Sequence, residues 1–400
     1  MLPHEPEPDP SMSEPLRVLH CVAGNLFGGV ETFLRTLAEC RDLSPGLRQE
    51  FALCFEGRLS AELREAGAVV HDLGEVRFSR PWTVWQARKR LTALSKKGRF
   101  DVVVDHGCWP QMLFGPAARR AGRPVVYWMH EMITEGGHWV ERGAGRSVPD
   151  LVLVHSHCTA ATLPRIYPRV RSEILRYPVK ARPVDRAEAR AAVRGELGTP
   201  ETDAVIVTAC RLEEWKGHRL LLEALGRLRE KPGWTAWVAG GVQRPQEQVY
   251  RDELMAAARD KGIADRVRFL GHRSDVPRLL AAADVHCQPN VAPEPFGIAY
   301  IEALHAGLPV VSTRMGGAAE IVTDACGVLT PPGDADALAA ALSALIDDPA
   351  ARRRLGAGGP ARAEAMCSPA AVLADMERLL RDVTTRAGAA GRGPVPQPVG

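Results

Sequence analysis

The segment EPFGIAYIEALHAGLPVVSTRMGGAAEIV, residues 294–322, joins a helix pattern to a strand pattern. Pro295 favours a helix start, and the apolar residues between 298 and 304 continue a helix predicted over 296–306. A Gly-Leu-Pro turn then leads into a β-branched run at 309–314. A helix followed directly by a short strand is typical of the parallel βαβ unit, so this segment predicts an α/β fold with a parallel sheet.

The same alternation extends from this segment towards both ends of the chain. In the second half, the pattern predicts strands at 204–210, 234–241, 266–271, 284–289, 309–314 and 327–330, and helices at 217–230, 246–262, 275–283, 296–306 and 334–347. In the first half, it predicts strands at 16–23, 50–55, 68–71, 101–105, 124–128, 150–155 and 173–179, and helices at 30–40, 59–66, 82–96, 116–121 and 156–164. Residues 180–200 carry proline and charge without a strand pattern, which indicates a linker.

Two α/β domains follow from this pattern, because 400 residues are too many for one ordinary α/β core. We expect a disordered tail at 1–15, a Rossmann-like domain at 16–183, a second one at 184–368, a helix at 369–386 and a disordered tail at 387–400. The last helix fits against either domain. In open sheets of this kind, ligands bind beyond the carboxyl ends of the strands.

The composition argues against a nucleic-acid-binding, disulfide-rich, secreted or membrane-spanning protein. Apolar residues make up 46% of the chain and charged residues 25%, which is average for globular proteins, and the net charge of +3 gives no reason to expect nucleic acid as a partner. The nine cysteines contain no Cys-x-x-Cys pair, which indicates free thiols in a reducing compartment. The acidic, proline-rich start lacks the apolar core of a secretory signal, and no run of about 20 apolar residues occurs. We therefore expect a cytoplasmic protein.

Glu294 and Glu302 are the first candidate site residues. Glu294 is predicted to lie in the loop before the helix, and Glu302 two turns inside it. The amides of Phe296, Gly297 and Ile298 would be unpaired donors at the helix N-terminus, which is a ready site for an anion. Ionised carboxylates only accept hydrogen bonds, so hydroxyl groups are their natural partners. A diphosphate flanked by two sugars matches this array.

The segment resembles retaining glycosyltransferase family 4, whose members have the GT-B fold. The resemblance rests on the Glu-x7-Glu spacing of Glu294 and Glu302, and on the Gly-x-Pro-Val-Val and Gly-Gly-x-x-Glu-Ile-Val elements of residues 307–322. It implies two Rossmann-like domains whose parallel sheets face a central cleft, with the acceptor bound by the N-terminal domain and the donor by the C-terminal one. It also implies that Glu302 holds the ribose hydroxyls and that Glu294 contacts the transferred sugar near the reacting centre.

Two cations and two glycines extend the predicted donor site. In ACRLEEWKGH, residues 209–218, Arg211 and Lys216 lie on a strand-to-helix loop. Fixed cations there would stabilise the negative charge that develops on a leaving diphosphate. Gly28 and Gly29 follow the first predicted strand and permit close approach to the backbone before a helix N-terminus. The family has comparable Arg…Lys-Gly and Gly-Gly elements at these places, and the resemblance implies that the glycine pair closes over the diphosphate.

His130 is the remaining candidate for catalysis. It follows a predicted strand in VVYWMHEM, a histidine can exchange protons near neutral pH, and the resemblance implies a contact with the donor sugar. His106 also ends a strand and fits a structural role equally well. Asp334 and Asp336 form an Asp-x-Asp pair, but their place before an alanine-rich helix predicts an N-cap and a first-turn acid. No metal and no other cofactor are expected, because the cations of the donor site take the metal's electrostatic role.

Residues 77–99 form a basic segment without any acidic residue. Its apolar positions recur at helical spacing and predict a face towards the core: Val84, Ala87, Leu91 and Leu94. The opposite face would be basic, with Trp82 and Trp85 near its start. Two interpretations fit this face: docking on an anionic membrane surface or acidic acceptor, and an ordinary solvated face beside an acceptor pocket. Peripheral contact at the inner membrane face is therefore an alternative to a purely cytoplasmic location.

The resemblance implies transfer of a hexosyl group from a nucleoside diphosphate sugar to an acceptor hydroxyl with retained anomeric configuration. Uridine is favoured as the base by its frequency among relatives, and the acceptor can be a carbohydrate, a lipid-linked sugar or a small molecule. Two other functions stay open: a nucleotide-sugar epimerase of the same fold, and a catalytically silent subunit that binds nucleotide sugar. The chain departs from the family pattern at Tyr177-Pro178-Val179 and at residues 286–290, positions that bear on hinge geometry.

Overall fold

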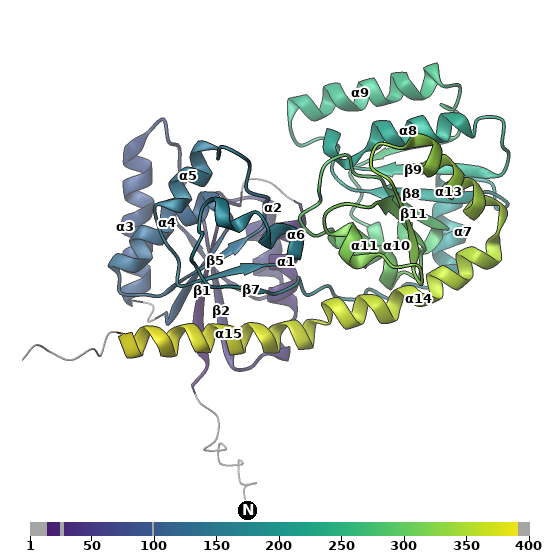
Figure 1. Ribbon diagram of the computed structural model, residues 1–400. Coiled ribbons are helices and arrows are strands. Elements are labelled where there is room, and N and C mark those ends of the chain that lie inside the picture. The colour runs from purple at the N-terminus through teal and green to yellow at the C-terminus, as the bar shows by residue number, and fades with distance from the viewer. Residues whose placement is uncertain (1–13, 25–27, 98–99, 391–400) are drawn as a thin grey trace, which may run out of the picture. The chain divides into compact units, whose positions relative to one another are not determined.

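The computed structural model describes residues 14–24, 28–97 and 100–390 of the chain (Figure 1). It divides into two compact units. Unit 1 comprises residues up to 155, 159–178 and the part of the chain from Pro369 onwards, and unit 2 comprises 156–158 and 179–368. Each unit contains one parallel sheet, which confirms the predicted α/β class of two Rossmann-like domains.

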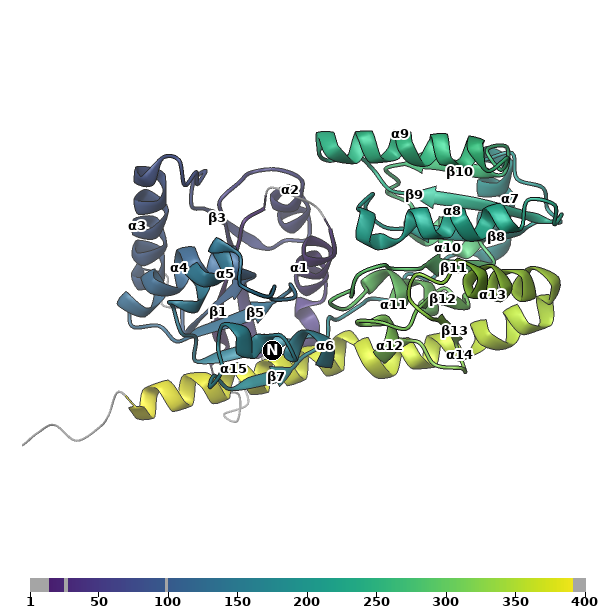
Figure 2. The ribbon, with the colours of Figure 1, turned by 45° about the horizontal axis from the view of Figure 1, so that its top comes forward.

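The sheet of unit 1 has the strand order β3-β2-β1-β4-β5-β6-β7 within the described residues, and all its pairs are parallel. Its strands are β1 Leu16–Val22, β2 Leu47–Leu53, β3 Val69–Asp72, β4 Val102–His106, β5 Val125–Met129, β6 Leu151–Val154 and β7 Ser172–Ile174. The helices are α1 Gly29–Glu39, α2 Arg58–Glu65, α3 Pro81–Lys97, α4 Cys108–Arg120, α5 Trp139–Gly145, the short α6 His157–Ala160 at the unit border, and α15 Pro369–Ala390. Figure 2 shows α3 and α4 on one side of this sheet and α1 and α2 on the other.

The sheet of unit 2 has the order β10-β9-β8-β11-β12-β13 and is also parallel throughout its described pairs. Its strands are β8 Ala204–Ala209, β9 Trp234–Ala239, β10 Val267–Gly271, β11 Val285–Gln288, β12 Val310–Thr313 and β13 Gly327–Thr330. The helices are α7 Arg186–Glu196, α8 His218–Arg227, α9 Pro245–Asp260, α10 Val276–Ala282, α11 Ile298–His305, α12 Ala318–Ile321, α13 Ala335–Asp347 and α14 Pro349–Cys367. Apolar side chains of α8, α9 and α13 pack together with the sheet in one core.

The strands read as continuous apolar runs because helices cover both faces of each sheet. In β5, all residues from Val125 to Met129 are fully buried, and Trp234 and Trp237 of β9 are at most 1% exposed. All nine cysteines are free thiols, as the sequence predicts. No helix among the described residues combines the length and the apolar character needed to cross a bilayer.

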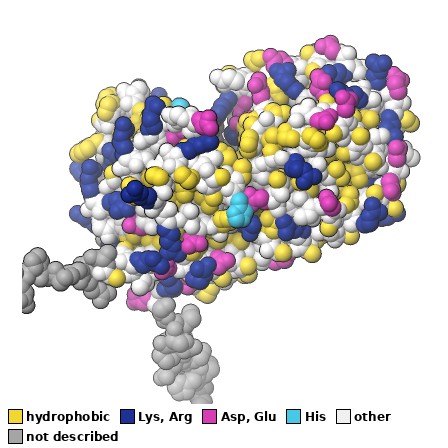
Figure 3. Space-filling model, viewed as in Figure 1, with side chains coloured by type: hydrophobic (Ala, Val, Ile, Leu, Met, Phe, Trp, Pro, Cys, Tyr) yellow, Lys and Arg dark blue, Asp and Glu magenta, His cyan; other side chains and the backbone are white. Residues whose placement is uncertain are grey.

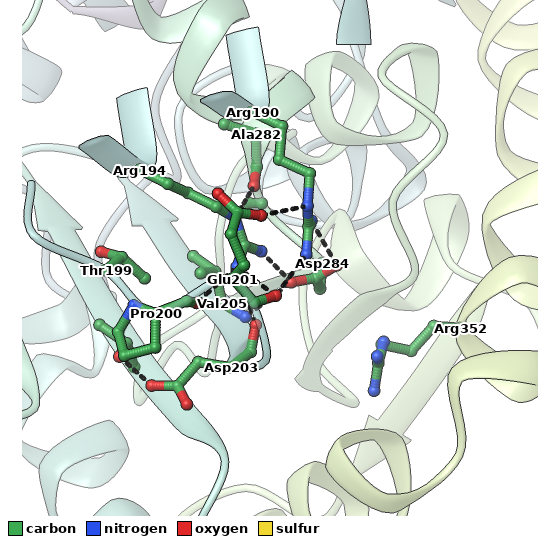
Figure 4. Close-up of polar contacts among 12 residues, drawn as sticks. Arg190, Arg194, Thr199, Pro200, Glu201, Asp203, Val205, Ala282, Asp284 and Arg352 are labelled. Carbon is green, nitrogen blue, oxygen red and sulfur yellow. Dashed lines mark hydrogen bonds and ion pairs between the residues drawn. The ribbon is translucent and has the colours of Figure 1, made fainter. Parts of the chain in front are cut away.

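Helix α7 overturns part of the prediction of a linker at 180–200. Asp185 caps this helix by accepting hydrogen bonds from the amides of Ala187 (2.9 Å) and Glu188 (3.0 Å). Arg194, fully buried, donates to Asp284 Oδ2 at 2.5 Å and to backbone carbonyls before β8 and β11 (Figure 4). The helix is therefore part of unit 2, and only the residues before it form the connection.

Helix α14 has no counterpart in the sequence prediction, because its three glycines and Pro360 lower helix propensity. The structure gives these glycines a packing role. A Cβ on Gly356 would overlap the Gly307 carbonyl oxygen, and one on Gly359 would lie 2.7 Å from the Leu304 carbonyl oxygen. Only glycine allows α14 to lie this close to α11 and the turn that follows it.

The structure also differs from the prediction in the bounds of α4 and α15 and in the presence of α5. Helix α4 begins at Cys108, well before the predicted start at 116, and α5 was not expected at all. Helix α15 continues to Ala390, past the predicted end at 386, and belongs to unit 1, where Arg381 donates to the Gly46 carbonyl at 3.0 Å. The predicted tail at residues 1–15 lies outside the described residues up to residue 13.

Candidate functional site

The candidate site of unit 2 lies where the order of its strands reverses. β8 and β11 are neighbours, while β9 lies on the other side of β8 and β12 on the other side of β11. The connections that leave β8 and β11 therefore diverge at the carboxyl ends of these strands, which is the place where doubly wound sheets bind ligands. Arg211 and Lys216 follow β8, and Glu294 follows β11, so the fold gathers them at one edge.

Lys216 and Glu294 form a nearly buried ion pair at this edge. Lys216 Nζ lies 2.5 Å from Glu294 Oε2, with the two side chains 13% and 10% exposed. Gln288 Nε2 (3.2 Å) and Asn290 Nδ2 (3.1 Å) donate to the same oxygen. The Lys216 ammonium also lies 3.9 Å from the ring centroid of Trp215. Gln288 and Asn290 were not singled out as site residues from the sequence, although residues 286–290 stood out as a departure from the family pattern.

Close backbone packing holds the Glu294 loop in place. Gly217, at φ +79°, lies so close to the Pro289 carbonyl that a Cβ would overlap its oxygen. A Cβ on Gly316 would overlap the backbone of Glu294, and Gly317 donates its amide to the Glu294 carbonyl at 2.8 Å. The glycine pair at 316–317 and the glycine after Lys216 thus shape the site through close approach of backbones.

Helix α11 begins at Ile298, two residues later than predicted. Gly297 is its N-cap at φ +105°, a backbone conformation that favours glycine, and a Cβ there would overlap the Tyr300 ring. Phe296 is buried before the helix. The first-turn amides therefore begin at Ile298, and Glu302, partly exposed, lies about one turn inside the helix instead of two.

Arg211 is about one third exposed and has a carboxylate partner of its own. Its Nη2 lies 2.8 Å from Glu213 Oε2, and Trp215 Nε1 donates to the same oxygen at 3.1 Å. Both cations that the sequence predicts for the donor site are thus paired with carboxylates inside unit 2. A bound diphosphate would compete with Glu213 for Arg211.

The other predicted residues, Gly28, Gly29 and His130, lie in unit 1. Gly28 caps α1 and donates its amide to Glu31 Oε2 at 2.8 Å. Its φ of −163° is an extended conformation that any residue adopts, so its backbone does not require glycine. Residues 25–27 of the same turn lie outside the described residues.

His130 belongs to a hydrogen-bonded chain that crosses the sheet of unit 1. His20 Nε2 lies 3.1 Å from Gln49 Oε1, and His20 Nδ1 lies 2.9 Å from His106 Nε2. His106 Nδ1 lies 2.9 Å from His130 Nε2, and His130 Nδ1 lies 2.5 Å from the Tyr177 hydroxyl. His106 and His130 stood out in the sequence, but no sequence signal indicated that the histidines are connected or that Tyr177 ends the chain.

The chain of imidazoles is uncharged near neutral pH. Burial lowers the pKa of His20 to about 4 and the pKa of His106 and of His130 well below the ordinary histidine value. With Gln49 accepting, each ring then donates to the one before it, and Tyr177 donates to His130. Any action of His130 on a ligand therefore starts from a ring whose two nitrogens already have partners.

The sequence of residues 189–362 matches the family described as glycosyl transferases group 1, and residues 28–207 match the glycosyl transferase 4-like domain. The chain is 32% identical over 273 residues to the GDP-mannose-dependent alpha-(1-6)-phosphatidylinositol monomannoside mannosyltransferase of Mycolicibacterium smegmatis, covering 62% of this chain and 68% of that protein. The chain belongs to the group 1 glycosyltransferases. The predicted resemblance to family 4 is thereby confirmed.

Other relatives of this glycosyltransferase match over a shorter part of their length. It is 35% identical over 167 residues to the lipopolysaccharide core biosynthesis glycosyltransferase LpsE of Rhizobium meliloti, which is 42% of this chain and 46% of that one. With the GDP-mannose-dependent monoacylated phosphatidylinositol monomannoside mannosyltransferase of Corynebacterium glutamicum, it shares 34% identity over 44% of its own length and 47% of that protein's. The chain thus spans about half the length of these relatives.

Solved structures show the same fold. Anabaena HepE, in complex with UDP and glucose, superimposes with a TM-score of 0.80 at 24% identity, covering 92% of this chain and 99% of HepE. The lipopolysaccharide glycosyltransferase WaaG gives a TM-score of 0.69 at 19% identity, covering 91% and 99% of the two chains. These similarities confirm the GT-B fold for this glycosyltransferase.

Two secondary predictions can also be compared with the structure. Asp334 is the N-cap of α13 and accepts from the Ala337 amide at 2.8 Å, as predicted for the Asp-x-Asp pair. In α3, Ala87 and Leu91 are fully buried, while Trp82 and Trp85 are exposed. Figure 3 shows Lys and Arg side chains gathered on unit 1 in the region of this helix.

Proposed function

We propose that this glycosyltransferase transfers a hexosyl group from a nucleoside diphosphate sugar, with UDP-sugar favoured, to an acceptor hydroxyl with retention of configuration. The observation that carries the proposal is the gathering of Arg211, Lys216 and Glu294 beside the N-terminus of α11 at the switch point of the unit 2 sheet. Cations and a helix N-terminus suit a diphosphate. The carboxylates suit the hydroxyls of the sugars on either side of it.

The proposed chemistry depends on charge that develops as the glycosidic bond breaks. The leaving nucleoside diphosphate gains negative charge, and Arg211 and Lys216 would stabilise it more strongly in the transition state than in the ground state. Glu302 would accept hydrogen bonds from ribose hydroxyls, and Glu294 would orient the transferred sugar. We propose that these residues act without a metal ion and that the chain needs no other cofactor.

The choice of nucleotide rests on two kinds of relatives. HepE was solved with UDP and with UDP-glucose, whereas two of the mannosyltransferase relatives are GDP-mannose-dependent. UDP is the proposed base and GDP its direct competitor. Relatives act in lipopolysaccharide core biosynthesis and on phosphatidylinositol mannosides, which supports a carbohydrate or lipid-linked acceptor.

Calorimetric titration with UDP, GDP, ADP, UDP-glucose and GDP-mannose tests the donor site. One base should bind, and Glu302→Ala should lose most of that binding, while Glu230→Ala, at a side chain 88% exposed elsewhere in unit 2, should not. Equal binding by wild type and Glu302→Ala would refute the assigned site. Product analysis by NMR, with and without acceptor, then separates transfer from epimerisation and from silent binding. The anomeric coupling constant of the product tests retention.

We also propose that the chain works at the cytoplasmic side of the membrane and contacts it through residues 77–99. Trp82 and Trp85 of α3 are 58% and 62% exposed, and Lys89 lies 5.1 Å from the Trp85 ring centroid. Exposed tryptophans beside lysines and arginines suit the interface of an anionic bilayer. Flotation with anionic and neutral vesicles tests this: Trp82→Ser/Trp85→Ser should abolish binding to anionic vesicles, and an unchanged bound fraction would refute it.

A further inference from the structure

Unit 1 contains a pocket of about 630 Å³ at the switch point of its own sheet. β1 and β4 are neighbours there, with β2 and β5 on their outer sides. The pocket is lined by residues that follow β1, β4 and β5 and by the start of α1 and the region of α5. Its position is the one where an open parallel sheet binds ligands.

Carboxylates from three different elements line this pocket. Glu31 comes from α1, Glu131 follows β5, and Glu141 belongs to α5. No lysine or arginine is among the described residues that line it. Trp109 supplies an aromatic wall and is held edge-on to Phe78, with ring centroids 5.9 Å apart.

Protein donors hold all three of these carboxylates, Glu31 through the Gly28 amide at 2.8 Å, and they leave part of the accepting capacity of Glu131 and Glu141. Glu131 accepts from the amides of Cys108 and His130 and from the Tyr127 hydroxyl. Glu141 accepts from the amide and hydroxyl of Thr134 and from the His138 amide. Since a carboxylate offers about four lone-pair sites, each retains room for a further donor.

The two buried histidines of the pocket do not offset this negative charge. His106 and His130 lie in the hydrogen-bonded chain described above, where burial keeps both rings uncharged. His138 is exposed and accepts the Val140 amide at Nδ1 (3.4 Å). The acidic side chains of the described pocket wall are the three glutamates.

This wall discriminates between classes of ligand. Hydroxyl and ammonium groups donate hydrogen bonds that carboxylates accept, whereas a phosphate brings further negative charge and only acceptor oxygens. The apolar face of a sugar or cyclitol ring packs against an indole such as Trp109. A bound metal ion is not the better occupant, because no three His, Cys, Asp or Glu side chains converge suitably among the described residues.

We propose that this pocket receives the acceptor and selects an uncharged or amino-bearing polyol, such as a sugar or cyclitol, against its phosphorylated form. Glu31, Glu131 and Glu141 are the selecting residues. The assignment of the ligand as acceptor rests on the proposed function, whereas the discrimination between ligand classes is a property of the pocket itself.

Saturation-transfer NMR on the full chain tests the discrimination without any donor. The probes are glucose, glucosamine, glucose 6-phosphate and myo-inositol, measured in phosphate buffer so that phosphate occupies simple anion sites elsewhere. Glucosamine, glucose and myo-inositol should give transfer signals, and glucose 6-phosphate should bind at least about tenfold more weakly than glucose. Stronger binding of glucose 6-phosphate, or no binding by any probe, overturns the proposal.

Variants of the pocket glutamates test whether the selection against the phosphorylated ligand arises in this pocket. Glu31→Gln is the mildest change, since glutamine also serves in a capping box, and Glu131→Gln is the second variant. Both should reduce the preference for glucosamine over glucose and raise the relative binding of glucose 6-phosphate. Glu65→Gln, at the exposed end of α2, is the matched control and should change neither. An equal effect of Glu65→Gln overturns the assignment.

A transfer assay separates this proposal from the proposed function. If the probes bind as expected but the chain transfers no sugar to any acceptor, the proposed function fails while the pocket's selectivity stands. If transfer occurs and phosphorylated acceptors are preferred, the selectivity fails while the proposed function stands.

Discussion

Lys216 and Glu294, 78 residues apart in the chain, meet as an ion pair with 2.5 Å between Nζ and Oε2. From the sequence, Lys216 was expected to contact the diphosphate of the donor, and Glu294 its transferred sugar. In the structure they form one ion pair, and Gln288 and Asn290 donate hydrogen bonds to the same Glu294 oxygen. A change at either residue therefore alters the charge of the other's surroundings.

This pairing predicts strong coupling between the two positions. Lys216→Met should leave the Glu294 carboxylate without its counter-charge, at a cost in stability of about 3 kcal/mol. The double variant Lys216→Met/Glu294→Gln should be more stable than the sum of the two single changes predicts, by about 1–3 kcal/mol. Urea unfolding of the four proteins measures this coupling, and additive effects would contradict the pair.

The Arg211–Glu213 pair predicts that the Glu213 carboxylate competes with a bound diphosphate for Arg211 and so lowers the affinity for nucleotide. Glu213→Gln should free the guanidinium and raise the affinity for the preferred nucleoside diphosphate about three- to tenfold. Glu214→Gln removes the same charge from the neighbouring, exposed position and is the control. If both variants raise the calorimetric affinity equally, general electrostatics explains the effect and the pairing does not.

Close packing of α14 on α11 predicts opposite effects of the same substitution at two helical glycines. Gly359→Ala should destabilise the protein by about 1–3 kcal/mol, because the new Cβ would lie 2.7 Å from the Leu304 carbonyl oxygen. Gly195→Ala in α7 meets nothing within 4 Å and should stabilise it by about 0.5–1 kcal/mol. Chemical denaturation distinguishes the two, and a neutral Gly359→Ala would contradict the packing.

The buried Arg194 predicts a large loss of stability on removal of its charge (Figure 4). Arg194→Met would leave the Asp284 carboxylate and several carbonyls before β8 and β11 without this donor, at a cost of about 3–5 kcal/mol. Arg278→Met removes an exposed partner of Glu188 and should change the free energy of unfolding by less than about 0.5 kcal/mol. Similar losses of unfolding free energy in the two variants would refute the explanation that burial of Arg194 makes its removal costly.

His286 in β11 predicts a dependence of stability on pH. Burial lowers the pKa of this histidine from 6.5 to about 4, and neither ring nitrogen has a hydrogen-bond partner among the described residues. Below pH 6.5 the unfolded chain binds a proton that the folded chain does not, so stability falls as pH decreases towards 4, by about 3 kcal/mol in total. His286→Leu should lose less stability over this range than wild type. Parallel curves in urea unfolding at several pH values would contradict the assignment.

Local patterns predicted most of the strands and the principal site motif. The alternation of β-branched runs with helical periods is local, and so is the Glu-x7-Glu spacing of Glu294 and Glu302. Helix α14 was not predicted because glycine lowers local helix propensity. Its glycines are needed only in the folded domain, where the helix packs closely against the Gly307 and Leu304 carbonyls. The start of α11 was predicted two residues too early because Pro295 favours a helix start. Gly297 has a left-handed conformation, so the helix begins only at Ile298.

The sequence by itself determined two parallel α/β domains and the edge of each sheet at which the candidate residues lie, since both follow from periodicity and from strand ends. Only the tertiary structure decided which side chains meet. The pairing of Lys216 with Glu294 and the chain from Gln49 to Tyr177 depend on β8 lying beside β11 and β1 beside β4. Strand order and register are set by packing of the whole domain, and no local pattern contains them.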